Sequence, residues 1–416
     1  MREANDIVVV GGGAAGLATA IFARRASADR RVVVLDGAKK PGAKILISGG
    51  SRCNVTNVEV TERDFWGGRA TIVRRVLRAF GADVTAAFFQ ELGVPLHEES
   101  GGKLFPDSNK SRDVLDALLR ELHARGATLQ ADHRVLEVTT DGDGFRIVTS
   151  RGERRARAVV LATGGQSLPK TGSDGAGFAI ARRLGHTIVP TTPALAPLVL
   201  DPEASFHRSV SGVSHEAEIA IWMDGAVCTR LRGALLWTHF GISGPVAMNA
   251  SRHWLRAQLE GRRVALTVSF CPGQSFDALD ETLVNAATIA PKSTVQAFTA
   301  ARVPASIAAA LLAQNAIDAR TTLAHLSRDA RRTLARALAE WPLPVTVTRG
   351  YAFAEATAGG VALEEIDPST MQSRVVPGLF IVGEMLDVDG RIGGFNFQWA
   401  WSTGYVAGRA LARVGT

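Results

Sequence analysis

Three glycines and one carboxylate near the start of the chain have the types and spacing of a nucleotide-binding site. The apolar run 7–10 leads into Gly11, Gly13 and Gly16, and a second apolar run ends at Asp36, 20 residues after Gly16. In a strand–turn–helix–strand unit, such glycines let the backbone approach a pyrophosphate, and the acid accepts hydrogen bonds from ribose hydroxyls. The pattern predicts that this unit binds an adenine dinucleotide. Glycines that only shape a turn are the alternative.

The start of the predicted helix supplies the positive end of this site. Its first turn, at Gly13, Ala14 and Ala15, leaves backbone N–H groups without helical acceptors, and the helix dipole adds partial positive charge there. The Asp36 carboxylate would repel a phosphate on the ribose, so we expect a dinucleotide without a 2′-phosphate at this position.

The composition is that of a folded protein with more than one domain. At 416 residues, with 46% hydrophobic and 21% charged residues, the chain is long enough for two or three domains. It has no apolar run near the ~20 residues that a membrane span needs. The first predicted strand begins within ten residues of Met1, which leaves no room for a cleavable signal peptide. We therefore expect a cytoplasmic protein that does not enter a membrane.

The cysteines argue against metal and disulfide chemistry. Cys53, Cys228 and Cys271 are far apart in the sequence and form no CxxC pair. A disulfide framework, a zinc site and a dithiol redox centre each need a different cysteine pattern. No group of His, Cys and Asp residues has metal-ligand spacing, so we expect no metal.

The chain is basic, and this raises the question of an RNA partner. Its net charge is +7 and its pI is near 9.7, as in some nucleic-acid-binding proteins. Only seven of the 47 cationic residues are lysines, however, which indicates a compositional bias toward arginine. Arg328, Arg332 and Arg336 share one face of a predicted helix, with Arg331 beside it. A solvated helix face is the first interpretation of these arginines, and an RNA contact is the second.

Hydrophobic periodicity predicts the elements that follow the first unit. The glycine-rich polar segment 37–57 predicts a loop whose N–H groups can face a ligand. Helical spacing runs through residues 70–97, and an amphipathic helix over 111–125 has Ser111 as its cap. Strands and one further helix are predicted over residues 135–138, 144–149, 158–161 and 173–184.

The middle of the chain has a different pattern and predicts an insertion. Short alternating runs over about 195–272 predict an antiparallel β domain, and the pattern becomes helical over 276–341. Pro291 and Pro304 are expected at helix starts. The dinucleotide domain is therefore predicted to be discontinuous and to be completed by the C-terminal residues.

The C-terminal return favours FAD over NAD as the resident dinucleotide. A strand over 378–382 ends in Gly383 and Glu384, and glycines precede a helix predicted over about 398–413. A purely nicotinamide-dependent enzyme needs no such return, whereas FAD-binding Rossmann proteins use one to hold the flavin end. Glu384 or Asp387 fits the acid that binds the ribityl chain. No second GxGxxG is present, so NADH or NADPH is expected to dock only transiently.

Several motifs in one order resemble the BaiN/RdsA-type NAD(P)/FAD-dependent oxidoreductases, a flavoprotein family of the glutathione-reductase-like Rossmann superfamily. The similarity covers nearly the whole chain. The motifs are KILISGGSRCNVTN (44–57), LFPDSNKSRDVLDALLREL (104–122), LATGGQSLPKTGSDGAGFAIARRLGH (161–186), LLWTHFGISGP (235–245) and ATAGGVALEEIDPSTMQSRVVPGLFIVGEMLDVDGRIGGFNFQWAWSTGYVAG (356–408).

The resemblance implies an α/β fold with a split FAD-binding Rossmann-type domain, an inserted antiparallel β-barrel and a small helical subdomain. The implied parts are residues 1–190, the first part of the FAD domain; 191–275, the barrel; 276–341, the helical subdomain; and 342–416, the return through the barrel edge to the FAD domain. Ser51 departs from the family pattern, which usually has a third glycine there.

The resemblance and the fingerprint together predict the FAD-binding residues. They are Gly11, Gly13, Ala14, Ala15, Gly16, Asp36, Lys44, Ser51, Arg52, Cys53, Asn54, Val135, Thr163, Gly164, Gly165, Gly383, Glu384, Asp387, Gly393, Gly394, Phe395 and Asn396.

The resemblance implies reduction of a conjugated C=C bond, which needs a hydride from the flavin and a proton from an acid. Cys53 and His239 are candidate acids, and Arg52 is a candidate ligand for the flavin or for a substrate carbonyl. The alternatives are that Cys53 is a small residue fitted against the flavin and that His239 is a structural histidine.

Three functions remain open from the sequence. A reductase or oxidase of small molecules, including an aminoacetone-type amine oxidase, predicts a closed apolar pocket at the flavin. A 23S ribosomal RNA dihydrouridine synthase uses the same flavin chemistry and predicts salt-sensitive RNA binding. A non-catalytic flavin-binding protein predicts a buried ring without a substrate cavity. The oligomeric state is unknown.

Overall fold

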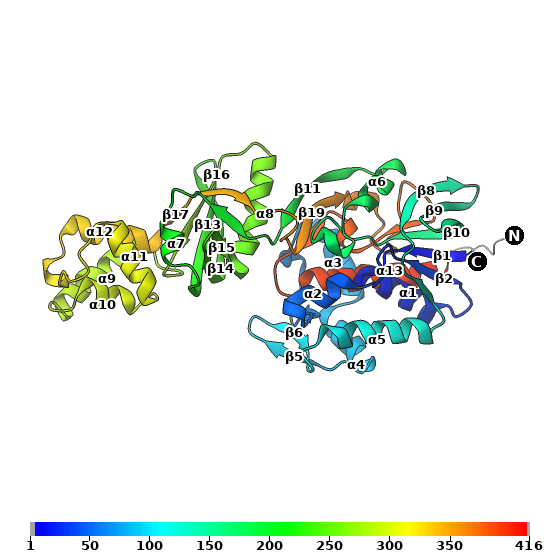
Figure 1. Ribbon diagram of the computed structural model, residues 1–416, viewed down its shortest axis with the longest axis horizontal. Helices are drawn as coiled ribbons and strands as arrows, with labels where there is room; N and C mark the ends of the chain where they lie inside the picture. The colour runs from blue at the N-terminus through cyan, green and yellow to red at the C-terminus, as the bar shows by residue number, and fades with distance from the viewer. Residues whose placement is uncertain (1–4, 414–416) are drawn as a thin grey trace. The chain divides into compact units, whose positions relative to one another are not determined.

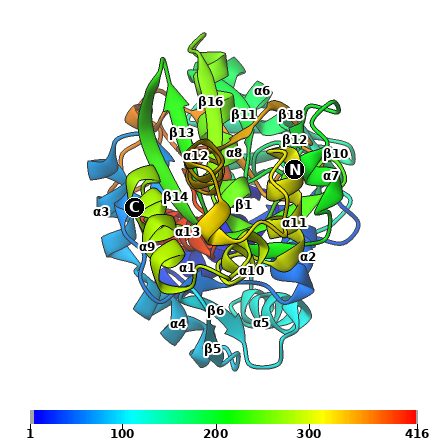
Figure 2. The same cartoon turned by 90° about the vertical axis from the view of Figure 1, so that its left-hand side faces the viewer.

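The computed structural model describes residues 5–413, which divide into two compact units. The first unit consists of the described residues up to Thr192 together with those from Glu355 onward, and the second is Pro193–Ala354. Figures 1 and 2 show the helices and strands of both units. The four-part division implied by the family resemblance stays a prediction.

A parallel sheet forms the centre of the first unit. Its strands follow the order β7-β2-β1-β10-β20. The strands are β1 (Asn5–Val10), β2 (Val32–Leu35), β7 (Thr128–Gln130), β10 (Gly152–Leu161) and β20 (Leu379–Ile381). The apolar runs of β1, β2, β10 and β20 are buried, as expected for parallel strands covered on both faces.

The two halves of strand β10 have different pairing partners on the same side of the sheet. Its first half, Gly152–Ala156, pairs antiparallel with β9 (Gly144–Thr149), which pairs with β8 (Val135–Asp141). Its second half, Val159–Leu161, pairs in parallel with β20. The C-terminal return predicted from the sequence therefore joins the first sheet directly.

Two helices pack tightly against each other beside this sheet (Figure 1). They are α1 (Ala14–Ala26) and the C-terminal α13 (Phe395–Leu411). A Cβ added at Gly404 would lie 2.8 Å from Ala18 Cβ, and one at Gly408 would lie 2.7 Å from Phe22 Cβ. Small residues thus let the helix axes approach closely, which fixes the two ends of the chain together.

The first unit contains five further α-helices and three small sheets among the described residues. Its other helices are α2 (Ala43–Ser51), α3 (Ala70–Ala79), α4 (Ala82–Glu91), α5 (Ser111–Ala124) and α6 (Ala176–Arg183). Its small sheets pair β3 (Thr56–Asn57), β6 (Lys103–Pro106) and β5 (Leu96–Glu99); β21 (Val388–Gly390) and β4 (Phe65–Gly67); and β11 (Ile188–Ala194) and β19 (Ala356–Val361).

The second unit is built on a seven-stranded antiparallel sheet. Its order is β17 (Trp341–Leu343), β16 (Val264–Ser269), β13 (Ser214–Met223), β14 (Ala226–Thr238), β15 (Gly241–Ser243), β12 (Leu198–Leu200) and β18 (Val345–Thr348). Its helices are α7 (Phe206–Ser209), α8 (Pro245–Leu259), α9 (Phe276–Ile289), α10 (Val295–Ala300), α11 (Ala305–Gln314) and α12 (Arg328–Ala339).

The Rossmann-type domain and the antiparallel sheet confirm the coarse fold class. Closure of the second sheet into a barrel and the helical subdomain as a separate part stay predictions.

Several local predictions need correction. Segment 37–57 is not a loop throughout, because residues 43–47 form a helical turn before the backbone turns left-handed. The helical spacing predicted over residues 70–97 corresponds to two helices, but its last residues belong to β5. Ser111 is the first residue of α5 and not its cap; its hydroxyl donates to Leu46 O (2.8 Å). Pro291 lies between α9 and α10, whereas Pro304 directly precedes α11.

Candidate functional site

Three strand ends meet at one edge of the parallel sheet. Val10 of β1 pairs with Leu161 of β10, and Leu161 pairs with Ile381 of β20. The turns that follow these strands therefore leave the sheet side by side at its carboxyl edge. This is the edge where α/β sheets bind ligands.

The first of these turns has the geometry of a dinucleotide fingerprint. Gly11 has φ +111°, and an added Cβ would lie 2.4 Å from Ala162 O; one at Gly16 would lie 1.9 Å from Gly11 O. By contrast, a Cβ at Gly13 would have no described atom within 4 Å. Gly11 and Gly16 are thus required by packing, whereas Gly13 faces open space at the N-terminus of α1, where a pyrophosphate would approach.

Asp36 has a role in the protein besides the predicted one. Its Oδ2 accepts from Gly12 N (2.6 Å) and its Oδ1 from Ala38 N (2.7 Å). The carboxylate therefore holds the glycine turn in place. Each oxygen keeps a further lone pair for a ribose hydroxyl.

The second turn, after β10, fits tightly against later parts of the chain. A Cβ at Gly164 would lie 2.5 Å from Ser173 Oγ, and one at Gly165 would lie 2.4 Å from Thr357 Oγ1. Thr163 Oγ1 contacts Met385 Sδ at 2.8 Å. Only residues without bulky side chains fit at this turn.

A charged cluster joins the second and third turns to α2. Lys44 Nζ lies 2.5 Å from both Glu384 Oε2 and Ser167 Oγ, and Ser167 Oγ lies 2.8 Å from Glu384 Oε1. All three side chains are half-buried or buried, so the lysine charge is largely balanced by Glu384. The structure thus brings together Lys44 and Glu384, two predicted site residues that are far apart in the sequence.

The end of α2 and the residues just after it have left-handed backbone conformations. Gly49, Gly50, Ser51 and Cys53 have φ values of +54°, +68°, +66° and +63°. Ser51, which stands where the family usually has glycine, therefore adopts a conformation that costs a non-glycine residue free energy. Such local strain is maintained by the surrounding structure and is common at ligand sites.

The loop that leads into α13 is fixed by side chains that bond to backbone groups. Gly394 is its N-cap, with φ +93°, and an added Cβ would lie 2.4 Å from Thr56 O. Asn396 closes the preceding loop through bonds with Gly390 N (2.8 Å) and Gly390 O (3.0 Å). Oriented to satisfy its contacts, the Asn54 amide accepts from Gly394 N (3.0 Å).

The other predicted FAD residues have varied surroundings. Phe395 is fully buried, with the Arg391 guanidinium 4.1 Å from its ring centre. Gly383 has φ +66° and donates its N–H to Thr403 Oγ1 (3.0 Å). Asp387 O accepts from Gly68 N (2.7 Å). Val135 is buried in β8.

The three predicted catalytic residues have different surroundings within their own units. Cys53 is fully buried, and burial raises the pKa of its thiol to about 12, although a hydrogen bond with Ser48 lowers it. Arg52 pairs with Glu99 at 2.5 Å and lies 4.2 Å from the Phe105 ring centre. His239 is exposed and belongs to the second unit. These surroundings favour structural roles for Cys53 and Arg52.

Four residues of the site region were not predicted from the sequence. Ser167 and Thr357 bond the turns together, Gln398 ties α13 to the 53–57 segment, and Glu355 lies just before β19. All four belong to, or directly adjoin, the motifs 161–186 and 356–408. In the sequence, the only indication of these roles was that each is a polar residue within an apolar or glycine-rich run.

A Ser–His–acid arrangement is also present, which the sequence did not reveal. His186 lies 2.7 Å from Glu365 Oε2 through Nδ1 and 2.9 Å from Ser373 Oγ through Nε2. However, Ser373 Oγ also accepts from Val375 N and Val376 N, and the His186 side chain is fully buried. Because the Ser373 hydroxyl is hydrogen-bonded to backbone N–H groups, this arrangement has a structural and not a catalytic role.

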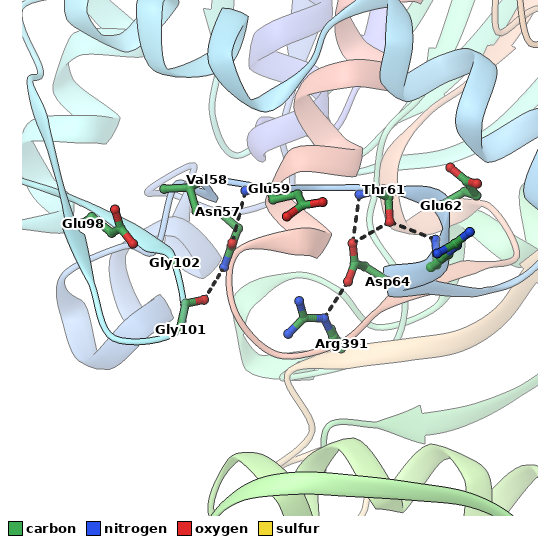
Figure 3. A pocket seen from close by; sticks show the side chains of 11 residues that line it. Asn57, Val58, Glu59, Thr61, Glu62, Asp64, Glu98, Gly101, Gly102 and Arg391 are labelled. Atoms are coloured by element: carbon green, nitrogen blue, oxygen red, sulfur yellow. Dashed lines mark hydrogen bonds and ion pairs between the residues drawn. The ribbon is translucent and has the colours of Figure 1, made fainter.

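A polar cavity of about 680 Å³ opens near the loop that leads into α13 (Figure 3). Asn57 Nδ2 donates to Gly101 O (2.9 Å) and Gly393 O (3.1 Å) at its wall. Asp64 accepts from Thr61 N (2.8 Å) and Arg391 Nε (2.7 Å). The acids on its wall are bonded within the chain or face solvent, and the cavity is unlike the apolar pocket predicted for a small conjugated substrate.

Residues 5–413 show neither a metal-binding cluster nor a membrane-spanning helix. In this range no group of three or more His, Cys, Asp or Glu residues is placed to hold a metal ion. Nor does any helix of the range have the length and apolar character for crossing a membrane.

The chain belongs to the HI0933-like family, whose Rossmann-domain model matches residues 5–410. It is 34% identical over 409 residues to the 3-dehydro-bile acid delta(4,6)-reductase of Clostridium scindens, covering 98% of this chain and 99% of the relative. It is 32% identical over 411 residues to the ribosomal RNA dihydrouridine synthase of Escherichia coli, covering 98% of each. The predicted family and oxidoreductase class are confirmed by these relatives.

A solved structure supports the fold alone. Escherichia coli quinol fumarate reductase FrdA has a TM-score of 0.52 and 16% sequence identity, with 99% of this chain and 70% of that chain covered. At this level of identity the similarity concerns the course of the chain and not its substrate.

Proposed function

We propose that this protein is an FAD-dependent oxidoreductase that takes reducing equivalents from NADH or NADPH and reduces a conjugated C=C bond. The observation that supports this proposal is the shared register of Val10, Leu161 and Ile381, which brings the three glycine turns to one sheet edge. Bound FAD would supply hydride chemistry that no amino-acid side chain can provide.

The residues present fit FAD. The open N-terminus of α1 at Gly13 would hold the pyrophosphate, and Asp36 the adenosine ribose. Glu384, already fixed by Lys44 and Ser167, would face the ribityl chain. The N-terminus of α13 at Gly394 would face the ring end, where its partial positive charge favours added negative charge.

The substrate class follows from the two relatives. The name of one describes reduction of a bile acid, and the name of the other describes formation of dihydrouridine in ribosomal RNA. Both reactions saturate a C=C bond conjugated to a carbonyl group. We place a small conjugated carbonyl compound first, because the arginines of α12 are engaged within the chain: Arg331 pairs with Asp280 (2.8 Å), and Arg332 lies over the Phe276 ring.

One experiment distinguishes which of these two substrate classes the protein reduces. The purified protein is reduced with NADH or NADPH without oxygen and then mixed with a 3-oxo-4,6-diene steroid or with 23S rRNA from a host that lacks the gene. We expect FAD to co-purify, NAD(P)H to bleach it, and the steroid to restore its absorption. Dihydrouridine in the RNA, measured by mass spectrometry, would instead favour the RNA enzyme. A colourless protein that takes up no FAD would refute the proposal.

A further inference from the structure

Arg391 connects the polar cavity of the first unit to the helix end that we assign to the flavin ring. It lies in the loop that leads into α13 and lines the cavity, where Figure 3 shows its guanidinium beside Asp64. Three residues later, Gly394 is the N-cap of α13. Asn57, on the same cavity wall, donates from Nδ2 to the carbonyl oxygen of Gly393 (3.1 Å). The cavity therefore adjoins the proposed ring end of the site.

Three contacts fix the Arg391 side chain and its backbone. Its Nε donates to Asp64 Oδ1 (2.7 Å), its backbone N–H donates to Asp64 O (3.0 Å), and its guanidinium lies 4.1 Å from the centre of the Phe395 ring. Asp64 Oδ2 in turn accepts from Thr61 N (2.8 Å) and Thr61 Oγ1 (3.1 Å). A guanidinium held in this way loses little conformational freedom when a ligand binds.

The same contacts leave part of the guanidinium available to a ligand. Within residues 5–413, neither Nη group of Arg391 makes a hydrogen bond or an ion pair, and 42% of the side chain is exposed. A guanidinium carries several N–H donors in a planar fork, and the bond to Asp64 uses only the one on Nε. The remaining donors can bind an oxygen atom that enters the cavity.

The charges around Arg391 favour a neutral oxygen as its ligand. Asp64 balances the guanidinium charge. Three further acids and one further arginine line the cavity: Glu59, Glu62, Glu98 and Arg63. This excess of acids would repel a phosphate or a carboxylate, whereas a carbonyl oxygen is uncharged and still accepts N–H bonds. The cavity therefore suits the polar carbonyl end of a substrate, and neither its apolar body nor an RNA backbone.

We propose that Arg391 binds the carbonyl oxygen of the conjugated substrate and stabilises the negative charge that forms there during reduction. This inference rests on the proposed function. Hydride derived from NAD(P)H forms a C–H bond at the alkene carbon farther from the carbonyl, and the π electrons shift until the carbonyl oxygen becomes an enolate oxygen. The Arg391 N–H groups donate to that oxygen. A proton from water then adds to the nearer carbon, which restores the carbonyl group and leaves a C–C single bond.

The test compares Arg391→Gln with Arg63→Gln, which removes the same charge from the wall of the same cavity. Both variants are loaded with FAD, reduced with NAD(P)H and mixed with the 3-oxo-4,6-diene steroid. We expect both to keep the rate of reduction by NAD(P)H within about threefold of the wild type, because the substrate carbonyl takes no part in that step. Steroid reduction should be about 10²- to 10³-fold slower in R391Q, the loss that follows removal of an oxyanion donor. R63Q should reduce the steroid at nearly the wild-type rate.

A third variant and a binding measurement distinguish a contact with the carbonyl from a general effect on the fold. Arg391→Lys keeps the positive charge but lacks the planar fork, so its steroid reduction should be faster than that of R391Q and slower than that of the wild type. The infrared carbonyl band of the steroid is measured on oxidised protein without NAD(P)H. Because N–H donation weakens the C=O bond, this band should lie at lower wavenumber in the wild type and R63Q than in R391Q.

The Arg391 assignment and the proposed function fail in different ways. Near-normal steroid reduction by R391Q, an equal loss in R63Q, or the same carbonyl band in R391Q and the wild type would overturn the assignment alone. A wild type that holds FAD but does not reduce the steroid would refute the proposed small-molecule reduction, and the assignment with it.

Discussion

Gly13 and Gly11 of the fingerprint turn are needed for different physical reasons. Substitution by valine should therefore affect FAD binding at Gly13 and stability at Gly11. Gly13 has an ordinary φ of −86° and open space around an added Cβ, so Gly13→Val should leave the fold intact but obstruct the pyrophosphate. Gly11 has φ +111° and a carbonyl oxygen 2.4 Å from the added Cβ, so Gly11→Val should destabilise the protein by more than about 3 kcal/mol.

The measurement is the FAD absorbance per chain together with the thermal unfolding temperature. We expect G13V to purify with less than a tenth of the wild-type flavin and an apoprotein unfolding temperature within about 2 °C of the wild-type apoprotein. G11V should unfold at a much lower temperature. A fully yellow G13V protein would contradict the assignment of this turn to the dinucleotide.

The three cysteines should react very differently, although the sequence does not distinguish them. Cys53 and Cys271 are buried, and burial raises the pKa of both thiols, whereas Cys228 is exposed. Because the thiolate is the reactive form, iodoacetamide at pH 8 should label Cys228 and leave the native Cys53 unlabelled. Peptide mass spectrometry checks this, with urea-unfolded protein as the control. Rapid labelling of native Cys53 would restore it as a candidate acid.

At the level of elements, Gln398 of α13 connects segments that are far apart in sequence. It is fully buried, its Oε1 accepts from Thr56 Oγ1 (2.6 Å) and its Nε2 donates to Phe80 O (2.8 Å). Gln398→Met keeps the size of the side chain but leaves the Thr56 hydroxyl unpaired, so the free energy of unfolding should fall by about 1–3 kcal/mol.

Urea unfolding followed by far-UV circular dichroism measures this change. Gln90→Met on the exposed surface of α4 is the matched control and should change stability by less than about 0.5 kcal/mol. An unchanged midpoint for Q398M would show that the buried network contributes little.

The elements also show what sequence patterns can and cannot predict. The strand ending at Leu161 and the C-terminal return were predictable because a short apolar run that stops at glycines is typical of a buried parallel strand. The helical turn in segment 43–51 was not predicted, because the glycines that follow it in left-handed conformation favour a loop. The Lys44–Glu384 pair and the position of Glu355 depend on sheet register, which a single sequence does not determine.

At the scale of the whole molecule, the main feature is that the first unit is discontinuous in the sequence. The first unit contains both the early and the late described residues, so the turns that we propose to bind FAD come from distant parts of the sequence. The unit closes only when β20 pairs with β10 and α13 packs on α1. A C-terminal truncation before residue 378 would therefore remove a sheet strand, a turn that we propose to face FAD, and a core helix together.

Charge is the other property of the whole molecule, and it bears on the RNA alternative. The second unit, residues 193–354, has 15 Lys and Arg residues against 12 Asp and Glu residues, which is a modest excess. The α12 arginines are engaged within the unit: Arg331 pairs with Asp280, and Arg332 and Arg336 lie 4.9 and 5.4 Å from the Phe276 ring centre. These arginines have a structural function without RNA.

Replacing both Arg332 and Arg336 by Gln should therefore leave the affinity for 23S rRNA within about twofold of the wild type. The matched control replaces Arg262 and Arg263, two exposed arginines elsewhere in the same unit, and removes the same charge. Filter binding over a range of salt concentrations is the measurement, since each phosphate contact contributes about −0.7 to −0.9 to the slope of log K against log salt.

If α12 instead contacts RNA, the R332Q/R336Q protein should lose at least tenfold in affinity and its slope should become shallower by about one to two. Because the control leaves α12 intact, that result would identify α12 as an RNA-binding surface and favour the dihydrouridine synthase over the small-molecule reductase.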